Sequence, residues 1–217
     1  MAKRADGLSR ELIVKTATEL LDGGGEAALT LRALTIRLNT GYGAIYHHIA
    51  NRDDLLATAT DDTIARVLTG LVVDADPREE LRAVALSLFD VIDAHPWVGA
   101  QLSREPWRPA LLAVYENIGR LLDALGVPEH ALFDAAGALA NYVLGVAGQN
   151  AANTRSLAER DADRAEFLGG VAARWSRLDP DKYPFVRKAA THLREHDDRE
   201  QFLAGIDIFL AGIATLR

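Results

Sequence analysis

The sequence predicts an all-α protein, and three observations indicate this class. Apolar residues recur three and four positions apart, as in Ile13, Ala17 and Leu20, which is the pattern of a helix with one buried face. No stretch alternates β-branched and polar residues as a half-buried strand would. Prolines and glycines stand where helices would begin or end, for example Pro77 and Gly126.

The expected helices follow from these signals in chain order. Ser9 caps the first helix, which the glycines at 23–25 end, and Thr30 caps a short second helix that leads into a tight turn at 39–41. A third short helix covers 42–48, and Asn51 opens a fourth. Longer helices are expected over 77–94, 109–126, 128–153, from after 164 to 178, over 185–195 and over 199–216. We expect a break at His95-Pro96 and a loop over 155–164.

The composition is that of an ordinary soluble globular protein. Of the 217 residues 49% are hydrophobic and 25% charged, which suffices for a sizeable core. The absence of cysteine excludes disulfide scaffolds, thiol catalysis and cysteine-bearing zinc sites. The first residues lack the apolar stretch of a secretory signal, and the apolar run at 135–148 is shorter than the ~20 residues of a membrane span. We expect a cytoplasmic protein with no membrane partner.

The charge divides the chain near residue 56. Residues 1–56 contain 7 basic and 7 acidic residues, so the net charge of −7 lies entirely in the remainder. Because phosphates repel an acidic surface, any DNA binding must come from the N-terminal part. Charge and helix length therefore place a domain boundary near residue 56, between residues 1–56, which would have to bind any DNA, and a second helical domain over 57–217.

The second and third helices with their tight turn form a helix-turn-helix. Ile45 and Ile49 supply a buried face for the third helix, which leaves its other face for the major groove. That groove-facing set is Tyr42, Ala44, Tyr46 and His47. The adjacent His47 and His48 point about 100° apart and cannot hold one metal ion together.

Three blocks at fixed spacing extend this pattern: Ala28-Leu29-Thr30-x-Arg32-x-Leu34, Ile45-Tyr46-x-His48-Ile49 and Asn51-Arg52-x-x-Leu55-Leu56. In these blocks the chain resembles the DNA-binding domain of the TetR family of repressors. The resemblance implies DNA contacts by Thr30, Arg32, Tyr42, Tyr46, His47 and Arg52, and we add Thr40, Gly43 and Ala44 around the start of the third helix.

Asn39 stands at the family's usual turn glycine, which is acceptable because asparagine tolerates the left-handed conformation. Three of the DNA-binding candidates leave alternatives open. Tyr46 can contact phosphate or pack the small domain, and Arg32 can bind phosphate or pair with Asp53 or Asp54, with phosphate favoured. Gly43 departs from the family's usual serine or proline. It either weakens the helix or lets the backbone approach DNA closely. Arg52 replaces the usual lysine and keeps a charge for phosphate.

The second domain is more weakly similar to the tetracycline-repressor branch of that family. The similar segments are His95-Pro96-Trp97, Tyr142-Val143-Leu144-Gly145, Asp179-x-x-x-Tyr183-Pro184 and Phe202-x-x-Gly205-Ile206-Asp207. The resemblance implies a ligand-binding and dimerisation domain. Leu102 and Gly148 stand where that branch holds a magnesium–drug chelate with a histidine and an acidic residue. We therefore do not expect tetracycline with magnesium as the effector, and we expect no metal or other cofactor.

The effector is expected to be a mostly apolar or aromatic small molecule. The proline-broken segment at 96–109 cannot form one continuous helix and could leave a concave space. The candidate ligand-binding residues are Phe89, Trp97, Trp107, Tyr115, Asn141, Tyr142, Gln149 and Trp175. Each of them could instead be an ordinary core or surface residue.

His192 and His196 match the H-x-x-E-H pattern of inverted zinc peptidases. Without a marked third ligand or substrate cleft, we interpret them as two histidines at a helix C-terminus, where the dipole favours them. No arrangement of a catalytic nucleophile and base is marked either, so we expect no enzyme.

Together these features predict a ligand-responsive transcriptional repressor that binds a palindromic operator as a homodimer. The dimer would use an apolar stripe of the last helix and a similar face of the long helix, although both faces could simply build the monomer core. The stripe contains Phe202, Ile206, Phe209, Leu210 and Ile213, and the face of the long helix contains Ala135, Leu139 and Val146. In the last helix Ala204 and Ala211, and Gly205 and Gly212, repeat at seven, and small residues at this spacing let helices approach closely. The alternative is an all-helical small-molecule-binding or enzymatic protein whose helix-turn-helix no longer functions. A salt series of DNA binding separates the two.

Overall fold

The computed structural model describes residues 8–71, 76–104, 107–160 and 163–216. Within these ranges the chain is helical and has no strand, so the all-α class is confirmed. The elements are α1 (Arg10–Ala28), α2 (Leu31–Leu38), α3 (Tyr42–Tyr46), α4 (Arg52–Thr69), α5 (Pro77–Ala94), α6 (Pro96–Arg104), α7 (Pro109–Ala124), α8 (Glu129–Glu159), α9 (Arg164–Ser176), α10 (Pro184–Ala189), the 3-10 turn η1 (Leu193–Glu195) and α11 (Asp198–Ile213).

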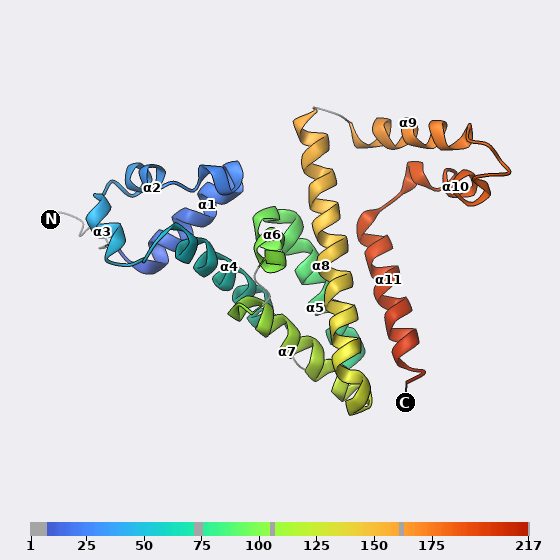
Figure 1. Cartoon of the computed structure of the whole chain (residues 1–217), viewed down its shortest axis with the longest axis horizontal. Helices are drawn as coiled ribbons and strands as arrows, with labels where there is room; N and C mark the ends of the chain where they lie inside the picture. The colour runs from blue at the N-terminus through green and yellow to red at the C-terminus, as the bar shows by residue number, and fades with distance from the viewer. Residues whose placement is uncertain (1–7, 72–75, 105–106, 161–162, 217) are drawn as a thin grey trace.

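The first three helices and the start of α4 form a small unit at one end of the molecule (Figure 1). Side-chain caps set the helix starts, because the Ser9, Thr30 and Asn51 oxygens each accept a hydrogen bond from a backbone N–H three residues on. Ile13 and Ile45, both fully buried, lie at its centre. All three predicted caps are confirmed.

Regular helical geometry ends at the glycines at 23–25, as predicted, and a separate short helical turn follows them within the range of α1. Gly24 and Gly25 leave helical geometry, and Gly25 adopts a φ of 63°, which is open to glycine. One further turn follows, and the Leu29 N–H closes it on the Glu26 carbonyl. This turn brings Glu26 to Arg104 at the end of α6.

Helices α5, α7 and α8 build the centre of the larger part, and α4 and α6 pack against it. The segment after Pro96 is not the open space that the sequence suggested. Pro96–Arg104 forms α6, which buries Val98 and Leu102. Proline here opens a new helix rather than preventing one. Residues 105–106 lie outside the described ranges.

The central helix α8 runs to Glu159, beyond the predicted end at 153. The prediction of a loop over 155–164 is therefore wrong for residues 155–159, which are helical. Its apolar stretch is also longer than the sequence suggested. By length and composition alone α8 could cross a membrane, and it is the one such helix in the described part of the chain. Much of its outer face is exposed, with small residues such as Ala138 and Gly145.

Helices α9 and α10 and the turn η1 form an arm that projects from the C-terminal end of α8, while α11 returns along α8 (Figure 1). Arg187 holds the arm together by donating to the Ser176 and Leu178 carbonyls at 2.6 and 2.7 Å. Helix α10 ends at Ala189, not at 195, so the two histidines do not close a long helix as predicted.

The apolar stripe of α11 points into the monomer. Phe202, Ile206, Leu210 and Ile213 are buried, and Phe202 stacks on Phe89 of α5 with ring centroids 4.7 Å apart. Leu139 of α8 is buried as well. These residues build the core of the monomer, so the apolar stripe takes the alternative role given for it, while the small residues Ala204 and Ala211 of the same prediction are exposed. The exposed side carries Ala204, Ile208 and Ala211.

Candidate functional site

The turn between α2 and α3 fixes the direction of the second helix of the pair. Asn39 adopts the left-handed conformation, with φ 47° and ψ 52°, which confirms that asparagine serves here in place of glycine. The Thr40 N–H then bonds the Thr35 carbonyl at 3.1 Å. With Ile45 and Ile49 buried beneath, α3 presents its opposite face to solvent.

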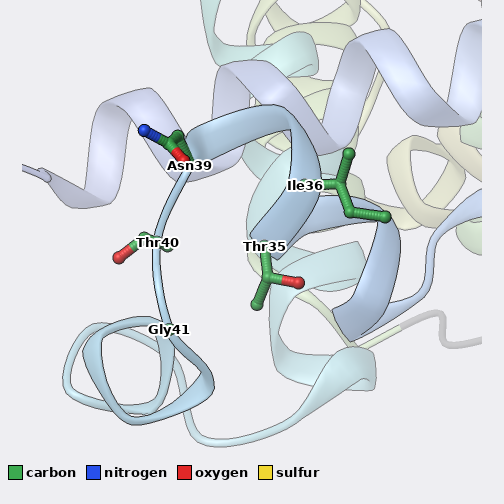
Figure 2. A pocket seen from close by; sticks show the side chains of 5 residues that line it. All are labelled: Thr35, Ile36, Asn39, Thr40 and Gly41. Atoms are coloured by element: carbon green, nitrogen blue, oxygen red, sulfur yellow. The ribbon is translucent and has the colours of Figure 1, made fainter.

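That outer face contains the predicted groove-facing residues. Tyr42 and Tyr46 are each 51% exposed, and Gly43, Ala44 and His47 are exposed beside them. Figure 2 shows a shallow concavity next to α3 that is lined by Thr35, Ile36, Asn39, Thr40 and Gly41. The sequence interpretation missed Ile36, which is 69% exposed. The sequence signal for Ile36 was an apolar side chain at a helix position outside the stripe formed by Leu31, Leu34 and Leu38.

The remaining DNA-binding candidates have different surroundings. The Thr30 hydroxyl accepts from the Ala33 N–H at 3.1 Å as the cap of α2, and Arg32 is exposed. Arg52 donates to the carbonyls of Leu29 and Glu26 at 2.9 and 2.5 Å and lies 3.5 Å from Asp53. In this structure Arg52 therefore fastens α4 to the end of α1, and its contact with phosphate stays a prediction.

A group of polar contacts joins the end of α1 to α6, and we call it the α1–α6 joint. The Asp22 carboxylate accepts from the Trp97 indole N–H at 2.8 Å and lies 2.6 Å from His95 Nδ1. One turn later Glu26 accepts from Gln101 at 3.1 Å and from Arg104 at 2.8 and 2.9 Å. The DNA-facing unit is thus tied directly to the large part of the molecule.

The joint stabilises the ionised form of Glu26. Partial burial alone would raise the pKa of this carboxyl group, but the hydrogen bonds from Arg104 and Gln101 and the charges of Arg104 and Arg52 outweigh it. The pKa of Glu26 is therefore lowered. The joint thus depends on a negative charge at this position.

A cavity of about 850 Å³ lies between α8, the arm and the start of α11. Its apolar surface comes from Val146, Leu168, Trp175, Phe185, Ala189 and Leu193. Its polar surface comes from Gln149, Asn150, Asn153, Lys188, His192, His196, Asp198 and Gln201. The volume is in the range of sites that bind small organic molecules.

The structure does not bring the eight predicted ligand residues together. Gln149 and Trp175 line this cavity. The other six lie elsewhere: Phe89 and Trp97 are buried in the core, Tyr115 is partly buried, Trp107 is 71% exposed, Asn141 is exposed, and the Tyr142 hydroxyl donates to the Phe202 carbonyl at 3.0 Å. Their chain positions gave no signal of this separation, because which of these positions line one cavity depends on how the helices pack.

His192 and His196, singled out for their zinc-peptidase spacing, both line the cavity. His196 Nε2 lies 3.0 Å from Asp198. Among the described residues, no group of three or more side chains is arranged to hold a metal ion. In place of a metal site, the two histidines contribute polar groups to the cavity wall.

Comparison with known proteins agrees with this architecture. Residues 73–217 match the family model of the tetracyclin repressor-like C-terminal domain. An HTH-type transcriptional regulator of Saccharopolyspora erythraea is 34% identical in an alignment of 181 residues that covers 76% of each chain.

Two solved structures extend the comparison over almost the whole chain. The transcriptional regulator SCO7222, a TetR from Streptomyces coelicolor, is 50% identical with a TM-score of 0.87, over 96% of this chain and 99% of that one. ActR from Streptomyces coelicolor in complex with actinorhodin is 26% identical with a TM-score of 0.74, over 97% of both chains. With its helix-turn-helix and the match over its larger part, the chain belongs to the TetR family of transcriptional regulators.

Proposed function

We propose that this regulator is a repressor that binds a palindromic operator as a homodimer and is released by an apolar or aromatic small molecule. The observation that carries the proposal is the α1–α6 joint. It connects the exposed face of α3, through α1, to the part of the molecule that contains the cavity. A ligand that favours one position of α6 would thereby favour one position of α3.

The α3 face supports DNA binding by its shape and exposure. Tyr42, Tyr46 and His47 project from a short helix whose other side is buried, which is the arrangement that places a helix in the major groove. The face is small, so a single copy makes few contacts. Two copies related by a two-fold axis double the footprint and match a palindrome.

The exposed sides of α8 and α11 support the homodimer. Ala138 and Gly145 on α8 and Ala204 and Ala211 on α11 are small and exposed, which lets helices approach closely, and Ile208 is 73% exposed. Two helices from each copy would form a four-helix interface. Such an interface would also cover the apolar outer face of α8, in agreement with a protein that lies in the cytoplasm.

The dimer is tested by sedimentation equilibrium of wild type and Ile208→Asp. We expect a dimer for wild type at micromolar concentration and a shift toward monomer for Ile208→Asp, because a charge at the centre of the interface would lose its water. Leu112→Asp is the matched control, since Leu112 is 56% exposed on α7. A monomeric wild type would refute the homodimer.

Repression is tested by selecting bound fragments from genomic DNA and measuring their affinity across a salt series. Counterion release predicts a steep fall of affinity with salt. Aromatic compounds are then screened for release of the selected DNA. Selection of no sequence, or an affinity that does not change with salt, would favour the alternative of a non-functional helix-turn-helix.

A further inference from the structure

We propose that the cavity between α8, the arm and α11 binds an aromatic organic anion, with Lys188 and His192 holding its acidic group. This inference rests on the proposed function, because it names the chemical class of the effector. Neither residue was among those that the sequence singled out for ligand binding.

The walls favour a flat aromatic body. Trp175 from α9 and Phe185 from α10 lie on the arm side of the cavity, and Leu168 and Val146 complete its apolar surface. Phe185 is 77% exposed and Trp175 is partly exposed, so both rings have surface that a ligand would cover. Aromatic side chains bind flat rings well because large areas leave water together.

The charges favour an anion. Asp198 is the one acidic residue in the lining, and Arg164 at 2.5 Å and His196 at 3.0 Å already engage its carboxylate. Lys188 and His192 line the same cavity, and in the described part of the chain neither side chain has an ion-pair partner. A carboxylate or sulfonate on the ligand would supply that partner.

The amides and the number of cations define the ligand further. Asn150 donates to Asp93 at 2.8 Å, and Gln149, Asn153 and Gln201 add amide groups that can bond hydroxyl or carbonyl oxygens. Lys188 and His192 supply too few positive charges to bind a polyanion such as a nucleoside triphosphate. The lining therefore favours an aromatic acid with one acidic group and further oxygens.

The test compares two fluorescent probes that share an anilinonaphthalene framework. 1-Anilinonaphthalene-8-sulfonate is anionic, and N-phenyl-1-naphthylamine is its uncharged counterpart. For the purified full chain we expect Lys188→Met to weaken sulfonate binding about tenfold, the loss of one charge-assisted hydrogen bond, and to leave the neutral probe unchanged. Lys182→Met is the matched control, because Lys182 is an exposed lysine outside the lining, over the Tyr183 ring.

A second readout locates the probe. Trp175 lines the cavity, whereas Trp107 is exposed on another part of the surface and Trp97 is bonded to Asp22. Quenching of tryptophan fluorescence by the sulfonate should largely disappear in Trp175→Phe and persist in Trp107→Phe. Equal effects of Lys188→Met and Lys182→Met, or quenching that survives in Trp175→Phe, would overturn the site.

Adding the sulfonate to the complex with selected DNA separates the two proposals. Release of DNA from wild type but not from Lys188→Met supports both. Binding that depends on Lys188 without release of DNA leaves the anion site in place and refutes its role as the effector site. Release that persists unchanged in Lys188→Met supports regulation by a ligand and refutes this site.

Discussion

The hydrogen bonds that Asp22 accepts across the α1–α6 joint predict a measurable loss of stability in Asp22→Ala. Trp97 is 5% exposed, so its indole N–H would lose its acceptor with little access to water, at a cost of about 1–3 kcal/mol. His95 is more exposed, and water can replace much of its contact with the carboxylate. We therefore expect the free energy of unfolding to fall by about 1–3 kcal/mol.

Urea denaturation at fixed protein concentration measures this loss, because the proposed dimer makes stability depend on concentration. Asp22→Asn keeps an acceptor oxygen for Trp97 and should lose about 1 kcal/mol or less. Glu19→Ala is the control on the same helix. Its carboxylate lies 3.7 Å from Arg37 with both side chains more than half exposed, so the change should stay within about 0.5 kcal/mol. If Asp22→Ala and Glu19→Ala are equally stable, the joint does not hold the two parts together.

Three further outcomes follow from the structure. Tyr46→Ala should weaken operator binding, measured by fluorescence anisotropy, at an unchanged free energy of unfolding, because the ring is half exposed. Arg52→Ala should weaken binding and also lower the free energy of unfolding, measured by urea denaturation, because it leaves the Leu29 and Glu26 carbonyls without their donor. Gly205→Ala would place a methyl group against the Tyr142 hydroxyl, which donates to the Phe202 carbonyl, and should cost about 1–3 kcal/mol in the same denaturation assay. Glu26→Gln should be less stable than wild type at neutral pH. Since the folded pKa of Glu26 is lowered, the difference should shrink as pH falls from the ordinary glutamate pKa through the folded value, and a difference independent of pH would contradict the role of its charge.

Local signals in the sequence were sufficient for the helix starts. Ser9, Thr30 and Asn51 cap their helices through bonds that span three residues, so the pattern contains the whole interaction. The left-handed Asn39 was predictable for the same reason. These elements position the DNA-facing side of the molecule.

The dimer face and the cavity depend on contacts between distant segments. Both sides of α11 are apolar or small, so periodicity alone could not decide whether Phe202 or Ile208 points inward. Lys188 and Gln149 line one cavity only because the chain turns back after α9 and brings α10 and the start of α11 toward α8. No local pattern encodes that return, so the sequence could not show which of the candidate aromatic residues border this cavity.

Helix α4 continues through the charge boundary at residue 56. It packs with α1 and also contacts α5, α6 and α7, and buried residues of both parts belong to one continuous core. A cut after residue 56 would divide this helix and expose Leu55 and Leu56. A chimaera that exchanges the DNA-reading part between two regulators would therefore need to transfer α4 together with its partners in α6. The unit of α1–α3 and the larger helical part therefore have to be kept together. We expect new operator specificity to be obtained more readily by changing single residues on α3 than by exchanging the whole unit.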